Sequence, residues 1–177
     1  MIHIPNMFMI GSTGRNSGKT TLAAAMVQKF KSTRTVIGLK VTSIEGPEEA
    51  CPRGGLGCGA CGSLVGSFQI IEETDKNTAK DTSQLLASGC AKVFWLKTLR
   101  THLAEGITEF LKLVPPDAII ICESNSLRHV VQPKAFIMLD NEKDTIKDTA
   151  KSVIDLADTV IREDIRTCAD MYIPDII

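Results

Sequence analysis

A glycine-rich segment near the start of the chain has the composition of a phosphate-binding loop. Residues 11–21 read Gly-Ser-Thr-Gly-Arg-Asn-Ser-Gly-Lys-Thr-Thr and follow a short apolar run. Glycines allow several backbone N–H groups to approach a phosphate, and a helix that begins after the loop adds the positive end of its dipole. The residues predicted to contact a bound nucleotide are Gly14, Arg15, Asn16, Ser17, Gly18, Lys19, Thr20 and Thr21.

The chemistry expected of this loop depends on its last residues. In loops of this kind the lysine, here Lys19, reaches the terminal phosphates, and the next hydroxyl, here Thr20, binds Mg²⁺. The spacing is a variant, because Thr13 stands five positions before Gly18, where glycine is usual. The alternative is a glycine-rich turn between a strand and a helix, with the lysine in solvent. The sequence does not separate GTP from ATP as the ligand.

Two further charged residues stand at the ends of apolar runs. Glu123 directly follows residues 118–122, so we expect it to hold Mg²⁺ directly or through water. Lys40 lies near the end of residues 35–41, where it would neutralise charge in phosphoryl transfer or hold an acidic second substrate. The alternatives are an ordinary polar residue and a solvated lysine. The predicted catalytic set is therefore Lys19, Lys40 and Glu123.

Three cysteines occur close together in a glycine-rich stretch. Cys51, Cys58 and Cys61 have the spacing C-x₆-C-x₂-C. Two cysteines two residues apart can chelate one metal ion, and three thiolates leave one coordination position open. We expect zinc or an iron–sulfur cluster at this stretch. The alternatives are a loop with reduced thiols and a redox pair formed by Cys58 and Cys61.

The source of a fourth ligand is open at this stage. Cys90, Cys122, Cys168 and a dimer partner are the candidates. Cys90 and Cys122 adjoin apolar runs, which indicates small, buried, apolar packing residues instead.

The apolar pattern predicts that strands and helices alternate along the chain. The expected strands cover residues 7–10, 35–41, 91–96, 118–122, 135–139 and 158–161, and the expected helices follow the loop and cover residues 80–88, 103–114 and 146–157. This alternation predicts an α/β, three-layer P-loop fold, with helices on both faces of a parallel or mostly parallel sheet. Ligands of such sheets bind beyond the carboxyl ends of the strands, where Lys19, Lys40 and Glu123 are expected.

Length and composition limit the domain organisation and the function classes. The 177 residues suit one nucleotide-binding domain over residues 1–177, with residues 44–72 as a cysteine-rich metal or cluster loop inserted after the second strand. The net charge of −1 and the lack of a basic run argue against nucleic acid as a partner. No long apolar stretch or secretory signal is evident, so we expect a cytoplasmic protein with no membrane contact.

The order of these motifs resembles the molybdopterin-guanine dinucleotide biosynthesis protein B family. The resemblance covers most of the chain and is carried by the Gly-Lys-Thr-Thr-Leu loop, the strand ending at Lys40, Lys80-Asp81-Thr82-Ser83, Ala87-Ser88-Gly89-Cys90-Ala91 and the strand ending at Glu123. It implies a dimeric, GTP-binding protein of the signal-recognition and MinD-like class that assists molybdenum cofactor maturation. It also implies that Asp81 lies near the nucleotide or the dimer interface.

Three functions therefore remain open. The first is a slow nucleoside triphosphatase, forming a homodimer, that couples nucleotide binding to maturation or delivery of a metal cofactor and works with a cofactor-biosynthesis or metalloenzyme partner. The second is an ATP-dependent ligase or kinase acting on a small acid, because Lys40 is also similar to the corresponding lysine of dethiobiotin synthetase. The third is a nucleotide-gated binding module without turnover.

Overall fold

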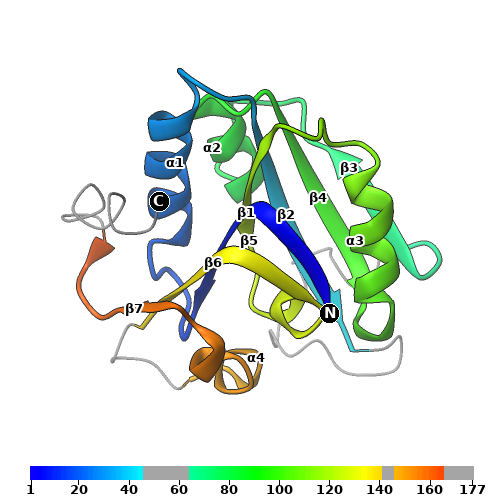
Figure 1. Ribbon diagram of the computed structural model, residues 1–177, viewed down its shortest axis with the longest axis vertical. Coiled ribbons are helices and arrows are strands. Elements are labelled where there is room, and N and C mark those ends of the chain that lie inside the picture. Colours follow the sequence, from blue (N-terminus) through cyan, green and yellow to red (C-terminus); the bar gives the residue numbers. More distant parts are fainter. Residues whose placement is uncertain (46–63, 141–145, 166–177) are drawn as a thin grey trace.

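The structure, a computed structural model, describes residues 1–45, 64–140 and 146–165. Within these ranges seven strands form one sheet in the order β3-β4-β2-β5-β1-β6-β7 (Figure 1). Every neighbouring pair is parallel except β3 and β4, which are antiparallel. The strands are β1 (Ile2–Ser12), β2 (Val36–Ile44), β3 (Phe68–Glu72), β4 (Lys92–Leu99), β5 (Ile119–Glu123), β6 (Val131–Leu139) and β7 (Thr159–Ile161). The prediction of an α/β protein with a mostly parallel sheet is confirmed.

Helices connect these strands and cover the sheet. The α-helices of the described ranges are α1 (Lys19–Phe30), α2 (Asp81–Ala87), α3 (Leu103–Leu111) and α4 (Asp148–Lys151), and the 3₁₀ turns are η1 (Arg100–His102), η2 (Ser126–His129) and η3 (Ile154–Leu156). None of the helices in this part of the chain has the length and apolar character needed to cross a membrane.

Two apolar cores lie on opposite faces of the sheet. One joins α1 and α2 to the sheet through residues such as Met26 and Leu85, and the other joins α3 and η2 through Phe110 and Leu127 (Figure 1). Alternate residues of one strand serve the two cores, as Ile121 of β5 shows by packing on the α1 side while its neighbours pack on the α3 side. This double coverage explains why the central strands are apolar throughout.

The segment after β6 differs from its prediction. One helix was expected over residues 146–157, but the structure has the four-residue α4 followed by the separate turn η3. Ala150 and Val153 are buried as the apolar pattern indicated, whereas Ile146 is exposed. Thr149, Ser152 and Val153 have low helix propensity. The apolar residues at helical spacing therefore identified the buried face of this segment, although the segment does not form one continuous helix.

The antiparallel strand β3 lies within residues 44–72, the segment expected to form an irregular insertion. Phe68 and Ile70 pack on the α3 side, and β3 adds an edge strand to the sheet beside β4. Residues 46–63 lie outside the described residues, and with them the predicted metal or cluster ligands Cys51, Cys58 and Cys61.

The cysteines of the central layer are packing residues, as expected. Cys90 and Cys122 are buried at 5% and 0% exposure and form no disulfide. Burial raises the pKa of the Cys90 thiol to about 12. Burial, with the charge of Glu123 next, raises the pKa of Cys122 further. Both thiols therefore stay protonated near neutral pH.

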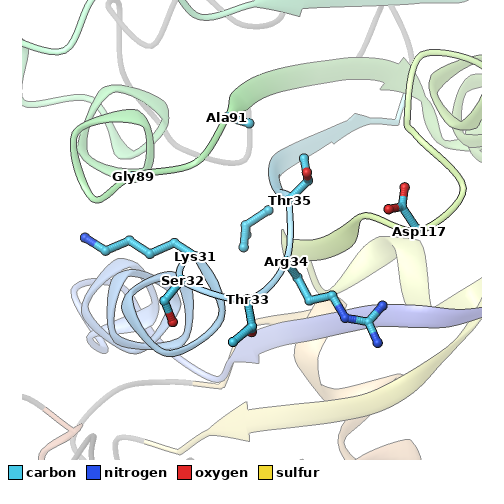
Figure 2. A pocket seen from close by; sticks show the side chains of 9 residues that line it. Lys31, Ser32, Thr33, Arg34, Thr35, Gly89, Ala91 and Asp117 are labelled. Atoms are coloured by element: carbon cyan, nitrogen blue, oxygen red, sulfur yellow. The ribbon is translucent and has the colours of Figure 1, made fainter.

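A depression of about 440 Å³ opens at the amino edge of the sheet (Figure 2). It is lined by residues 31–36 together with Gly89, Ala91 and Asp117. These positions directly precede or begin β2, β4 and β5. The depression consequently lies at the opposite edge from the carboxyl ends of the strands, where the predicted site residues stand.

Candidate functional site

The sheet order brings the two predicted charged residues beside the 11–21 loop. β5 lies between β1 and β2, and Glu123 at its end is paired in register with Ile10 on one side and Lys40 on the other. Gly11 and Ser12 are the last residues of β1 and start the loop. Because the three strands are parallel, their carboxyl ends meet at one edge, which is where α/β sheets bind ligands.

The loop ends at a glycine whose backbone conformation other residues rarely adopt. Gly18 has φ 86°, in the left-handed region, and directly precedes α1. A Cβ atom there would lie 2.1 Å from Cγ2 of Ile165, which is itself buried. Asn16 also has positive φ, at 51°. The first turn of α1 carries no acidic residue of its own.

Lys19, the first residue of α1, folds back along the loop. Its Nζ donates a hydrogen bond to Oγ of Ser12 at 2.8 Å, and that hydroxyl donates to the carbonyl of Gly14 at 2.9 Å. The ammonium is therefore held above the loop at the end of β1. This is the position from which it can reach an anion bound to the loop amides.

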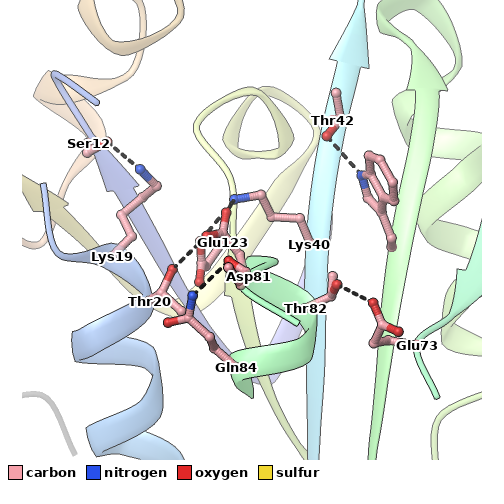
Figure 3. Close-up of polar contacts among 12 residues, drawn as sticks. Ser12, Lys19, Thr20, Lys40, Thr42, Glu73, Asp81, Thr82, Gln84 and Glu123 are labelled. Atoms are coloured by element: carbon pink, nitrogen blue, oxygen red, sulfur yellow. Dashed lines mark hydrogen bonds and ion pairs between the residues drawn. The ribbon is translucent and has the colours of Figure 1, made fainter. Parts of the chain in front are cut away.

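Four side chains from four different elements meet in front of the loop (Figure 3). Nζ of Lys40, on β2, lies 2.6 Å from Oδ2 of Asp81 and 3.0 Å from Oε2 of Glu123. The hydroxyl of Thr20, on α1, donates to Oδ1 of Asp81 at 3.3 Å. Asp81 is the first residue of α2, and Glu123 is the last of β5. One ammonium thus bridges two carboxylates, and one of these carboxylates is bonded to the loop threonine.

The charges of this cluster control one another. Burial by itself would lower the pKa of Lys40, but the carboxylates of Glu123 and Asp81 raise it above its ordinary value. Partial burial would raise the pKa of Asp81, yet Lys40, the Thr20 hydroxyl and Lys19 together hold it below its ordinary value. Both groups are consequently charged over a wide pH range.

Two buried oxygens at this edge have no hydrogen-bond partner within the described residues. They are Oε1 of Glu123 and Oγ of Ser17. The Glu123 side chain has no exposed surface, and Ser17 is 6% exposed. An unsatisfied carboxylate oxygen is costly in such a place, because burial removes its contact with water. A ligand or cation that binds here would remove this cost.

This donor set fits Mg²⁺. Thr20, Asp81 and Glu123 offer hard oxygen atoms, and proteins hold Mg²⁺ with one or two carboxylates plus the phosphates of a substrate. Within the described residues no three His, Cys, Asp or Glu side chains form a cluster that could hold a metal alone. The site therefore suits a cation that arrives with a phosphate ligand and keeps several waters.

Residues from the far end of the chain support the loop. The Asn125 side chain accepts from the backbone N–H of Ser12 at 2.8 Å and donates to its carbonyl at 2.9 Å. Nζ of Lys147 donates to the carbonyl of Gly14 at 2.6 Å, and its backbone N–H donates to Thr13 at 3.1 Å. The loop is thereby fixed from the segments that follow β5 and β6.

The structure places the predicted site residues as follows. Lys19, Thr20, Lys40 and Glu123 come together at the carboxyl edge, whereas Arg15, Asn16 and Thr21 are exposed and Gly14 and Ser17 are buried within the loop. Cys51, Cys58 and Cys61 lie outside the described residues.

Sequence reasoning missed three contributors. Asp81 was indicated only by the family resemblance, although an acid that opens a helix is a usable signal. Asn125 followed Glu123 in a polar stretch and was not singled out. Lys147 lies in a charged stretch without a recognisable motif, yet its side chain reaches the loop carbonyl of Gly14. No local pattern distinguishes such a lysine from a solvated one.

Comparison of the chain with protein-family models, with curated proteins and with solved structures gave no match.

Proposed function

We propose that this protein binds a Mg²⁺–nucleoside triphosphate at the 11–21 loop and hydrolyses it slowly. The observation that supports this most directly is the convergence of Thr20, Lys40, Asp81 and Glu123 in front of the loop, with Oε1 of Glu123 buried and without a partner in the described residues. The proposal includes a P-loop nucleotidase fold, which the strand order and the position of the loop support.

Each side chain has a definite task in this proposal. The loop amides and Lys19 bind the β- and γ-phosphates, since the lysine already lies along the loop. Thr20, Asp81 and Glu123 hold Mg²⁺, which neutralises phosphate charge and orients the terminal phosphate. Lys40 places a second ammonium where negative charge develops during transfer of that phosphate.

Hydrolysis is proposed to be slow in the isolated protein. Rapid phosphoryl transfer to water usually needs a residue that orients the water and an arginine that stabilises the transition state. The 11–21 loop contains one arginine, Arg15, and it is exposed. A partner protein or a second substrate would therefore be needed for fast turnover.

The process coupled to this nucleotide site is proposed to be maturation or delivery of a metal cofactor, by a homodimer, as in molybdenum cofactor biosynthesis. This part rests on the family resemblance and on the C-x₆-C-x₂-C spacing of Cys51, Cys58 and Cys61. Anaerobic purification followed by metal and sulfide analysis tests it. Zinc or acid-labile sulfide that is lost in Cys58→Ser supports the proposal, and a metal-free protein contradicts it.

An ATP-dependent ligase or kinase acting on a small acid is the second candidate. Lys40 favours it, because its ammonium lies beside the loop, in contact with Asp81 and Glu123, where an acidic substrate would meet a positive charge. Stimulation of nucleotide turnover by a small carboxylate supports this candidate. Absence of turnover in every condition, with nucleotide-dependent binding of a partner protein, would instead indicate a binding module.

Nucleotide binding itself is tested with Lys19→Ala. Isothermal titration with MgATP and MgGTP should show affinity reduced at least about 100-fold, because a charge-assisted contact to the phosphates is lost. Lys29→Ala, in the last turn of the same helix, is the matched control and should bind like the original protein. Equal affinity of Lys19→Ala and the original protein would refute the proposed site.

A further inference from the structure

Strand β1 extends beyond the end of its neighbour β5. In the register of the two strands Ile10 is paired with Glu123, the last residue of β5, so Ser12 would be paired with residue 125 if β5 continued. The backbone N–H of Ser124 still donates to the carbonyl of Ile10 at 3.1 Å. The chain then turns toward η2, and Asn125 has helical backbone angles, φ −88° and ψ −51°. Strand β5 therefore offers no backbone partner to Ser12.

The side chain of Asn125 takes the place of the missing strand residue. Its Oδ1 accepts from the backbone N–H of Ser12 at 2.8 Å, and its Nδ2 donates to the carbonyl of Ser12 at 2.9 Å. The N–H of the next residue, Thr13, points to the other side and donates to Leu139 of β6 at 3.0 Å. A carboxamide has both a donor and an acceptor, as a peptide unit has, so this asparagine replaces two bonds of a parallel ladder.

Gly11 makes room for this contact. A Cβ atom on Gly11 would lie 2.7 Å from Oδ1 of Asn125 and 2.9 Å from Cε2 of Phe136. Both distances are shorter than Cβ atoms tolerate, so a side chain there would displace the carboxamide or the ring. The loop has Thr13 where glycine is usual and Gly11 two positions earlier. The structure explains Gly11 by the close approach of Asn125.

Ser12 connects this contact to the lysine of the loop. Its hydroxyl accepts from Nζ of Lys19 at 2.8 Å and donates to the carbonyl of Gly14 at 2.9 Å; Figure 3 shows the bond from Lys19. Ser12 is 1% exposed, so its backbone groups are shielded from water and need partners within the protein. Fixing the backbone of Ser12 therefore also fixes the hydroxyl that holds Lys19.

We propose that Asn125 is the positioning residue of the phosphate-binding loop and sets the affinity of the site for its nucleotide. In this role the carboxamide touches no substrate and acts through Ser12. Without it, the buried N–H and carbonyl of Ser12 lose their partners, the start of the loop has other conformations, and a smaller fraction of the protein is competent to bind. The inference rests on the proposed function and names the residue that controls that same site.

Nucleotide titration of Asn125→Ala tests this role. The full chain is titrated calorimetrically with MgATP and with MgGTP, and the variant should bind at least about tenfold more weakly, because two hydrogen bonds that hold the loop are lost. Where this variant does not fold, Asn125→Asp replaces it. That variant keeps the acceptor for the N–H of Ser12 but loses the donor to its carbonyl, so it should also bind more weakly.

Asn6→Ala is the matched control. Asn6 lies in the amino half of β1 and also bonds a backbone group, because its Nδ2 donates to the carbonyl of Ala118 at 2.6 Å. Its loss should reduce stability in urea without reducing nucleotide affinity. The comparison separates a role in the loop from a general effect on the fold.

Hydrogen exchange followed by NMR reports the contact itself, without a nucleotide. The Ser12 amide should exchange at least about tenfold faster in Asn125→Ala than in the original protein, since its acceptor is gone. The Thr13 amide, which bonds to Leu139, is the internal control and should change less than about threefold. Saturating MgATP or MgGTP should slow exchange of Ser12 in the original protein, because coupling between two binding events is reciprocal.

The outcomes separate this inference from the proposed function. If a nucleotide binds Asn125→Ala as tightly as the original protein, Asn125 does not position the loop. If Asn6→Ala loses as much affinity as Asn125→Ala, the effect comes from overall stability and the inference is also wrong. If the Ser12 amide responds as described but the original protein binds no nucleotide, the contact with Asn125 stands and the proposed nucleotide site fails.

Discussion

Lys40 is the residue on which the charge balance of the candidate site depends. Its ammonium contacts Asp81 and Glu123 at 2.6 and 3.0 Å, and Glu123 has no exposed side-chain surface. Without it, the two carboxylates would face each other at the edge of a low-dielectric core. The lysine therefore occupies the position between the acids that a divalent cation is proposed to share.

The first prediction is that Lys40→Met destabilises the protein by about 3 kcal/mol, because it leaves the buried charge of Glu123 without a counterion. Urea unfolding measures the change. The double variant Lys40→Met/Glu123→Gln should recover much of the loss, since it removes both charges of the pair. Mg²⁺ should stabilise Lys40→Met more than the original protein. Equal stability of Lys40→Met and the original protein would disprove this account.

The second prediction concerns stability in acid. The pKa of Asp81 is lowered in the folded state, so its charged form stabilises the protein above the ordinary carboxyl pKa of about 4, and this contribution is lost as pH falls through the lower folded value. The original protein should therefore exceed Asp81→Asn in unfolding free energy at pH 6, and the difference should shrink toward zero below about pH 3. A difference that does not change with pH would contradict the ion pair.

At the scale of elements, the 11–21 loop is shaped by what packs around it. β1 ends in Ser12, which Asn125 holds through both of its backbone groups, and α1 begins after Gly18, against Ile165. Residues 11–21 include no large apolar side chain, so these neighbours keep the loop in one conformation. Binding an anion then costs less ordering of the backbone, which is the advantage of a preformed site.

The third prediction is that Gly18→Ala destabilises the protein more than Gly66→Ala does. Both glycines have a positive φ, but at Gly18 a Cβ atom would also meet a close neighbour. Gly66 has φ 76° with nothing within 4 Å of a Cβ atom, so Gly66→Ala should cost about 1 kcal/mol from backbone strain. Gly18→Ala adds the close contact with Ile165 and should cost clearly more, with a loss of nucleotide affinity. Thermal unfolding and nucleotide titration compare the two. Equal costs would mean that Ile165 moves away freely.

At the scale of the whole molecule, the charged side chains of the candidate site and the apolar cores lie on different parts of the sheet. The charged cluster of Thr20, Lys40, Asp81 and Glu123 lies toward its carboxyl edge, and its two faces carry the cores. Phosphate binding by loop amides and a few lysines needs no basic surface, which agrees with the net charge of −1. Over the whole chain, 20 Lys and Arg residues nearly balance 21 Asp and Glu residues.

The fourth prediction concerns thiol reactivity of the folded molecule. Cys90 and Cys122 are buried with raised pKa values, so at pH 8 neither should be alkylated by iodoacetamide in the native state. Peptide mapping by mass spectrometry should find both modified after unfolding in urea. Labelling of Cys122 in native protein at the rate of the unfolded chain would show that the central layer opens readily.

The sequence by itself determined the parts that depend on local pattern. Apolar runs predicted six of the strands, and the start of the helical spacing marked the end of the loop. A strand buried on both faces is apolar throughout, whereas a helix buried on one face has apolar residues every three to four positions. The chemistry of Lys19, Thr20 and Glu123 was also legible, since these residues begin α1 or end β5. The second strand was expected to end at Lys40, but β2 continues to Ile44 and Lys40 lies within it. In residues 146–157, where helix propensity is low, the apolar pattern predicted the buried positions Ala150 and Val153 but not the break in the helix.

Only the tertiary structure decided which side chains meet. β5 lies between β1 and β2, and no local signal reports this order, so the bridge from Lys40 to Asp81 and Glu123 could not be read from spacing. The support of the loop by Lys147 joins residues 133 positions apart, and β3 packs at an edge that its own composition does not specify. Periodicity encodes which face of an element is buried, whereas the partner of that element depends on the packing of the whole chain.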